Sequence, residues 1–223
     1  MKNSRVLFGF LLGAFGASSY GATLTATYTF AMNQGVSFSM GSLTGAQTAG
    51  INGVRTGGTT TLLPGAPYAF NAYCVEVTEH ISGGSQTHTD VSNLLGSTTV
   101  TGGVFFDAVR TTRIEKLWGT YFPTIAGNAN RSAAFQLAQW EICFDTDMNL
   151  AGGGTFTSSD SVAALAQSFL DGISNGSATQ RQGMILLSGE GIQDQVTPVP
   201  EPASMTALAL GAAAMLRRRK SAK

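Results

Sequence analysis

The first half of the chain alternates apolar and polar residues with a period of two, which predicts β-strands. Residues 23–30 alternate strictly, and one face of this segment carries Leu24, Ala26, Tyr28 and Phe30. The same alternation returns over residues 36–40, after turn-forming residues at 33–35. We therefore expect the two segments to pair as a β-hairpin.

The next apolar alternation follows a Gly- and Thr-rich segment, residues 41–66, which its composition predicts to be a loop. Residues 68–81 then have strand character. One face of this predicted strand carries Tyr73, Val75 and Val77, and the other carries Ala72, Cys74 and Glu76.

The second half shows helical spacing of apolar residues. We expect one helix over residues 111–121, a second over 131–144 with Asn130 as its N-cap, and a third from Ser158 or Ser159 to 173. The apolar run 184–187 reads as a closing strand. Strands, then helices, then a strand predict an α+β fold, a β-sandwich or barrel-like set of strands with a helical insertion of two to three helices.

The N-terminus has the three parts of a secretory signal peptide. Lys2 and Arg5 precede the apolar run 6–15, and small residues follow as far as Ala22. This order is typical of a signal peptide that is cleaved after Gly21 or Ala22. We expect residues 1–21 to be removed on export.

The C-terminus has a different three-part pattern. Pro200, Glu201 and Pro202 precede the uncharged stretch 203–216, and the basic cluster Arg217, Arg218, Arg219 and Lys220 follows it. As a helix this stretch would span about 21 Å, which is short of the roughly 30 Å thickness of the hydrocarbon core. The basic cluster would stay on the cytoplasmic side. We expect a short transmembrane segment that anchors the chain temporarily.

This tail resembles the PEP-CTERM sorting signal, through Pro200-Glu201-Pro202, the spacing and the terminal arginines. The resemblance implies that a membrane transpeptidase of the exosortase type recognises and cuts the tail. It implies passage through the inner membrane and a final place at the cell surface or in the extracellular matrix. We assign residues 194–223 to the sorting tail and 22–193 to one folded body.

The formal net charge of zero conceals an acidic body. Residues 22–193 carry six basic and eleven acidic side chains, a net charge of −5, and Lys116 is the only lysine among them. A nucleic-acid-binding domain needs a basic surface to displace counterions from phosphates. The composition therefore argues against nucleic acid as a partner.

Two short segments carry the candidate chemistry, Ala72-Tyr73-Cys74-Val75 and Phe135-Gln136-Leu137-Ala138-Gln139-Trp140. They resemble the thioester domains of bacterial surface adhesins, in which a cysteine and a glutamine form an internal thioester. The resemblance implies that Cys74 supplies the sulfur and Gln136 the acyl group, with Ala138 and Trp140 matching the helix motif. Gln139 departs from the motif, which usually has an aliphatic residue there.

The chemistry of such a pair has two requirements. The cysteine must act as a thiolate, which the positive end of a nearby helix favours, and Gln136 lies near the start of the second predicted helix. Water must also be excluded until a partner arrives, and Tyr73, Phe135 and Trp140 are the candidates for an apolar wall.

The competing interpretation is a disulfide between Cys74 and Cys143, because an exported chain meets an oxidising compartment. Gln136 and Cys143 are seven positions apart, which is about 10.5 Å along a helix. A Cys74 seated against Gln136 would then be too far from Cys143 for a disulfide, which needs Cα atoms about 4.4 to 6.8 Å apart. A third possibility is two inert buried thiols.

Other groupings are weaker. His80 and His88 are expected at the surface, and they lack the close ligand spacing of a structural zinc site with Cys74 and Cys143. Residues 145–149 begin like a calcium loop, but Leu150 and Phe156 occupy positions where that loop needs glycine and glutamate. A solvated turn at a helix end is the preferred interpretation, and we expect no metal.

These patterns predict an exported, surface-sorted protein that attaches covalently to an amine- or hydroxyl-bearing ligand through its thioester. The attachment occurs once, so the protein is expected not to be an enzyme, and it needs no cofactor. The alternative is a passive extracellular matrix protein, structural or ligand-binding, stapled by the Cys74–Cys143 disulfide. A hydrolase would need an acid, a base and a nucleophile that the sequence does not bring together.

Overall fold

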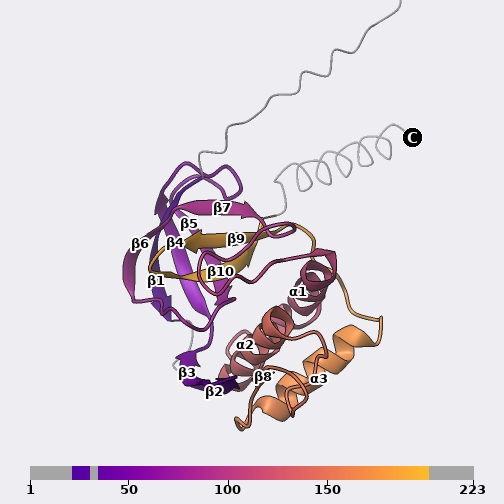
Figure 1. Ribbon diagram of the computed structural model, residues 1–223. Helices are drawn as coiled ribbons and strands as arrows, with labels where there is room; N and C mark the ends of the chain where they lie inside the picture. Colours follow the sequence, from indigo (N-terminus) through magenta and orange to yellow (C-terminus); the bar gives the residue numbers. More distant parts are fainter. Residues whose placement is uncertain (1–21, 31–34, 201–223) are drawn as a thin grey trace, which may run out of the picture.

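Two antiparallel sheets and three α-helices make up the part of the chain that the computed structural model describes, residues 22–30 and 35–200 (Figure 1). The strands are β1 Leu24–Phe30, β2 Gly35–Met40, β3 Leu43–Thr48, β4 Ile51–Gly57, β5 Tyr68–Cys74, β6 Gly84–His88, β7 Asp90–Asn93, β8 Phe156–Thr157, β9 Met184–Gly189 and β10 Ile192–Pro198. The helices are α1 Ala108–Tyr121, the short 3₁₀-helix Phe122–Thr124, α2 Ala129–Phe144 and α3 Ala163–Ser174. The predicted α+β class is confirmed.

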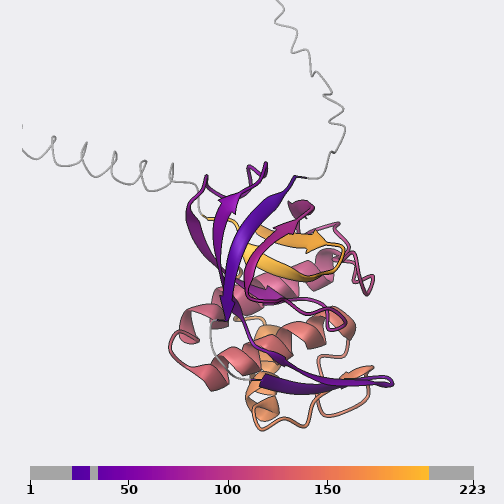
Figure 2. The same ribbon diagram turned by 90° about the vertical axis from the view of Figure 1, so that its left-hand side faces the viewer.

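The larger sheet has seven strands in the order β6-β1-β4-β5-β10-β9-β7 and curls into a nearly closed barrel. Only Thr89 separates β6 from β7, and its N–H donates to the carbonyl of Ser188 in β9 at 3.0 Å. β6 forms one edge of the sheet, beside β1, and β7 forms the other edge, beside β9. Because β6 and β7 are almost continuous in the chain, the two edges of the sheet come together. This curvature gives the barrel-like shape seen from the side in Figure 2.

The helices pack against one side of the barrel, and the small sheet β3-β2-β8 lies beyond them (Figure 1). α2 contacts β5 of the barrel as well as β2 and β8 of the small sheet. Twelve of its sixteen residues are buried, which explains why its sequence lacks a polar face. α2 is therefore the central helix of the fold.

The apolar side chains form two separate cores. One fills the barrel and includes Leu24, Tyr28, Phe70 and Leu187. The other lies between the barrel wall and the helices and includes Cys74, Trp118, Phe135, Trp140 and Phe156. The neighbouring β5 residues Ala72 and Tyr73 thus enter different cores, since successive residues of a strand point to opposite faces.

The predicted hairpin of residues 23–30 and 36–40 is wrong. β1 pairs with β4 and β6, whereas β2 pairs with β3 and β8 in the small sheet. Phe30, predicted to face the core, is 44% exposed. Alternation identifies a strand and its faces, but the choice of partner depends on contacts distant in the sequence. The predicted turn at 33–34 lies outside the described residues.

The predicted loop over residues 41–66 is also wrong, since it contains the whole of β3 and β4. Gly53 shows the reason, because a Cβ placed on it would lie 2.4 Å from Cζ of Phe70 on the neighbouring strand. The glycine is required by an aromatic ring packed over the strand, and not by a turn.

Several boundaries differ from the prediction. β5 ends at Cys74, and the folded body continues to Pro198 in β10, past the predicted boundary at 193. Asp107 and Asn128 cap α1 and α2, whereas α3 begins at Ala163 without a side-chain cap from Ser158 or Ser159. The predicted signal peptide and the predicted transmembrane segment 203–216 lie outside the described residues.

Candidate functional site

Cys74 is the last residue of β5, and it is buried with 1% of its surface exposed. It lies opposite Gln195 in the β5–β10 ladder, and the N–H of the following Val75 donates to the carbonyl of Asp194 at 3.0 Å. The thiol therefore sits where a barrel strand ends beneath the docked helix α2.

Two glutamines of α2 bind the backbone around Cys74. Oε1 of Gln136 accepts from the Cys74 N–H at 3.2 Å, and its Nε2 donates to the Cys74 carbonyl at 2.8 Å. Nε2 of Gln139 donates to the carbonyls of Tyr73 and Cys74, both at 3.1 Å. These amides satisfy the polar groups at the end of β5 much as a neighbouring strand would.

The sulfur of Cys74 has a different partner. Its Sγ donates to Oε1 of Gln193 at 2.7 Å. Gln193 lies in β10 at an irregularity of the β9–β10 pairing, and its Nε2 donates to Oε1 of Gln47 and to the carbonyl of Glu76, the latter at 3.2 Å. Both glutamines are buried, with 7% of Gln47 and 3% of Gln193 exposed.

The structure therefore brings Cys74 and Gln136 together, as the sequence motif predicted, but through the backbone of Cys74. The sulfur faces Gln193, which the sequence reasoning missed because it placed the end of the body there. The turn residues Glu190-Gly191, followed by the β-branched Ile192, Val196 and Thr197, were the available signal for β10, and Gln193 would then have been a third candidate amide.

The thiol is not activated as expected. Burial raises the pKa of Cys74 far above its ordinary value, and the nearby Glu76 raises it further. Burial therefore favours the neutral thiol over the thiolate that the sequence predicted. Burial likewise raises the pKa of Cys143 to about 12.

Cys74 and Cys143 are both free and buried. The disulfide that would staple the alternative, passive protein is not formed in the structure. Cys143 lies on α2 in the core between the helices and the barrel, without a role in the polar cluster around Cys74.

The aromatic side chains predicted to exclude water are all buried, but they form two groups. Tyr73 and Phe135 pack together with ring centroids 4.6 Å apart, and the Tyr73 hydroxyl bonds to the Ser132 hydroxyl at 2.7 Å. Trp140 instead contacts Phe38, at 5.2 Å between centroids. Ala138 is fully buried on the same helix.

A surface pocket reaches this polar cluster. It is lined by Phe30, Ala46, Gln47, His80, Ile81 and Gln193. Gln47, Ile81 and Gln193 are its buried members, whereas Phe30, Ala46 and His80 are exposed. The pocket therefore offers a route from solvent to the amide that touches the Cys74 sulfur.

The two histidines have different environments. His80 is exposed as predicted, but His88 is fully buried, which corrects the prediction of a surface residue. Its Nε2 lies 2.7 Å from the hydroxyl of Tyr28 inside the barrel. Burial lowers the pKa of His88 to about 4.

The comparisons with known proteins concern the tail of the chain. Residues 198–220 match the family model of the PEP-CTERM protein-sorting motif. No curated protein and no solved structure matches the chain. Within residues 22–30 and 35–200, no helix combines the length and apolar character that crossing a bilayer requires.

The matched motif begins at Pro198, the last residue of β10, and it contains all six predicted sorting residues, Pro200, Glu201, Pro202, Arg217, Arg218 and Arg219. This motif marks an exported protein that an exosortase processes at the membrane and that is sorted to the cell surface. The folded body thus leads directly into its sorting signal.

Proposed function

We propose that this exported, surface-sorted protein attaches covalently to a surface or matrix component through an internal thioester, and that the bond joins Cys74 to Gln193. The contact of 2.7 Å between Cys74 Sγ and Gln193 Oε1 carries the proposal. A distance of about 2.7 Å is usual for an O–H···O hydrogen bond. Sulfur is larger than oxygen, so this S–H···O contact is a close one. The acyl carbon of Gln193 is one covalent bond away from that oxygen.

Gln193 replaces Gln136 as the acyl donor in this proposal. Both ends of the Gln136 amide are bonded to the Cys74 backbone, at 3.2 and 2.8 Å, and its side chain is fully buried. That arrangement positions Cys74, whereas Gln193 faces the sulfur and lines the pocket. Gln136 and Gln139 are positioning residues that hold the end of β5 against α2.

Thioester formation requires no external reactant. The Cys74 sulfur attacks the side-chain carbonyl carbon of Gln193, a C–S bond forms, the C–N bond breaks, and the thiol proton leaves with the amide nitrogen as ammonia. The leaving nitrogen is Nε2, which the carbonyl of Glu76 already holds at 3.2 Å. Alignment of the reacting groups by the fold lowers the entropic part of the barrier.

The bond is then protected until a partner reaches it. The sulfur lies in a core that excludes water, so hydrolysis is suppressed. An amine or hydroxyl that enters the pocket attacks the acyl carbon, forms an amide or ester with Gln193, and releases the Cys74 thiol. The protein is consumed in the process, so it acts once and is not an enzyme.

Methylamine labelling tests the proposal. The purified full chain is expected to have lost one ammonia in its intact mass and to gain one methylamine, which peptide mapping places on Gln193. Cys74→Ala should abolish the labelling. An unmodified mass and no incorporation would contradict the thioester and leave the passive matrix protein.

A matched pair of variants separates the two glutamines. Gln193→Asn shortens the side chain by one methylene and withdraws the acyl carbon from the sulfur, so it should abolish labelling. Gln136→Asn should still give methylamine on Gln193. Labelling of Gln136 in the unsubstituted protein would instead favour the assignment made from the sequence motif.

A further inference from the structure

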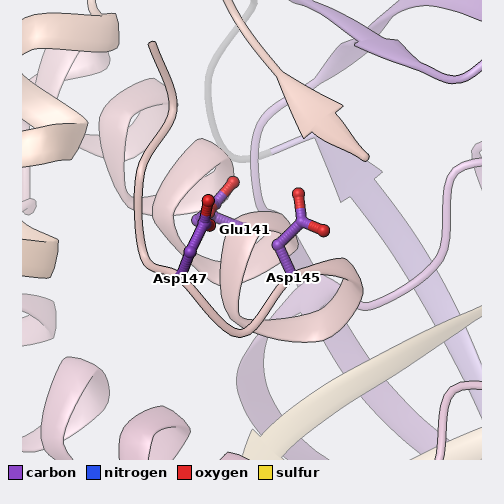
Figure 3. A group of neighbouring side chains, drawn as sticks. All are labelled: Glu141, Asp145 and Asp147. Carbon is purple, nitrogen blue, oxygen red and sulfur yellow. The ribbon is translucent and has the colours of Figure 1, made fainter. Parts of the chain in front are cut away.

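Three carboxylates gather where α2 ends, outside the Cys74 site. Glu141 lies in the last turn of the helix, Asp145 is its C-cap, and Asp147 follows in the next turn (Figure 3). One oxygen from each lies within 4.8 Å of the others. Three ionised carboxylates in so small a volume would repel one another, and a bound cation would offset that repulsion.

Glu141 has an oxygen without a partner. The side chain is fully buried, and its Oε1 accepts from the Asn149 N–H at 2.8 Å. Its Oε2 is buried and accepts no hydrogen bond from the described residues. A buried carboxylate oxygen with no donor is rare, because the desolvation cost is not offset. Glu141 therefore has an unused ligand atom among the three carboxylates.

The hydrogen bonds that the described residues give to these carboxylates come from neutral backbone N–H groups. Asp145 accepts from the N–H groups of Thr155 and Phe156, at 2.9 and 2.6 Å. Asp147 accepts from the Asn149 N–H at 3.3 Å. The C-terminal end of a helix also carries partial negative charge. The electrostatic potential of this cluster therefore favours a cation.

We propose that Glu141, Asp145 and Asp147 bind one calcium ion, with Glu141 Oε2 as its buried ligand. Ca²⁺ prefers oxygen ligands at about 2.3–2.6 Å, so two ligand atoms on opposite sides of the ion are at most about 5 Å apart. The separation of 4.8 Å or less in this group fits that range. Asp147 is exposed, so water completes the coordination shell on its side.

The proposed site differs from the calcium loop considered in the sequence. That loop needs ligands after residue 149, where Leu150 and Phe156 are buried core residues. The structure supplies Glu141 instead, one helical turn before Asp145. The carboxylate of Asp145 also bonds to the backbone at β8, so bound calcium ties the end of α2 to the small sheet.

Calcium titration of the full chain tests the site. After treatment with EDTA and dialysis, isothermal titration with CaCl₂ should give one bound ion per chain, and millimolar Ca²⁺ should raise the melting temperature. An absence of both heat and thermal shift at several millimolar Ca²⁺ overturns the proposal.

Three variants assign the ligands. Glu141→Gln and Asp147→Asn should each weaken calcium binding by at least about tenfold, because each removes one charged ligand. Glu190→Gln, an exposed residue in the β9–β10 turn, should bind like the unsubstituted protein. Asp147 is exposed, so its variant remains folded and keeps the test valid if Glu141→Gln does not fold. Asp147→Asn that binds calcium as tightly as the unsubstituted protein overturns the assignment.

Discussion

The indole Nε1 of Trp118 donates to Oε1 of Gln139 at 2.9 Å, which joins α1 to α2 at the place where α2 contacts β5. The other end of the same amide donates to the carbonyls of Tyr73 and Cys74. Gln139 therefore connects three elements through one side chain. The glutamine at position 139, where the thioester-domain motif usually has an aliphatic residue, therefore has a structural role.

Gln139→Leu should destabilise the fold. The leucine conserves much of the side-chain volume but leaves the buried indole N–H of Trp118 without an acceptor, which costs about 1–3 kcal/mol. Urea unfolding of the two proteins measures the difference. The double variant with Trp118→Phe should be less destabilised than the sum of the single variants, because no unpaired indole remains. Strict additivity would contradict the coupling.

His88 should make stability depend on pH between about 6.5 and 4. Its folded pKa is about 4, below the ordinary value of 6.5, so only the unfolded chain takes up its proton in this range. The contribution of His88 to the free energy of unfolding is therefore fully present above about pH 6.5. It decreases as the pH falls towards 4, by about 3 kcal/mol in total.

Urea unfolding at several pH values, compared with His88→Gln, isolates this contribution. The stability difference between the two proteins should shrink, or reverse, as the pH falls from 7 to 4. A difference that stays constant across the range would show that His88 titrates alike in the folded and unfolded chains.

Gly119→Ala should destabilise the protein, although alanine is normally favoured over glycine within a helix by about 1 kcal/mol. A Cβ at this position of α1 would lie 2.3 Å from the carbonyl oxygen of Thr179 and 2.8 Å from the N of Arg181. The segment before β9 would have to move, at a cost of about 1–3 kcal/mol. Thr112→Ala in the same helix is the control and should be neutral or stabilising. A more stable Gly119→Ala variant would contradict the close packing.

Cys143→Ala should leave methylamine labelling unchanged, because the sulfur that contacts Gln193 belongs to Cys74. Intact mass after methylamine treatment measures this directly. Loss of the adduct in a variant that remains folded by circular dichroism would give Cys143 a part in the chemistry.

Replacement of Pro200, Glu201 and Pro202 by alanine should block sorting, since these residues lie in the matched motif. Immunoblotting of fractionated cells should find the uncut chain with the membrane. Cys74→Ala leaves the motif intact and should be processed normally, which separates sorting from the thioester. Normal processing of the triple variant would contradict its role in sorting.

The sequence by itself determined the sorting tail, the three helices and the presence of four of the strands. These features are encoded by residues that are close together in the sequence. A sorting motif is contiguous, and the period of the hydrophobic residues indicates which face of a helix or strand is buried. The predicted bounds of the three helices lie within a few residues of the observed bounds. The reason is that the apolar residues that predicted each helix are also the ones that pack against the rest of the protein.

Only the tertiary structure decided which groups meet. Gln193 reaches the Cys74 sulfur because β10 inserts between β5 and β9, and the alternation of residues along a strand carries no information about its neighbour. His88 is buried because its strand closes the barrel, and Glu141 joins Asp145 and Asp147 because the chain turns back at the end of α2. The contacts of Gln193 and His88 join residues far apart in the sequence, and the carboxylate cluster depends on the path of the turn after α2, so local composition encodes none of them.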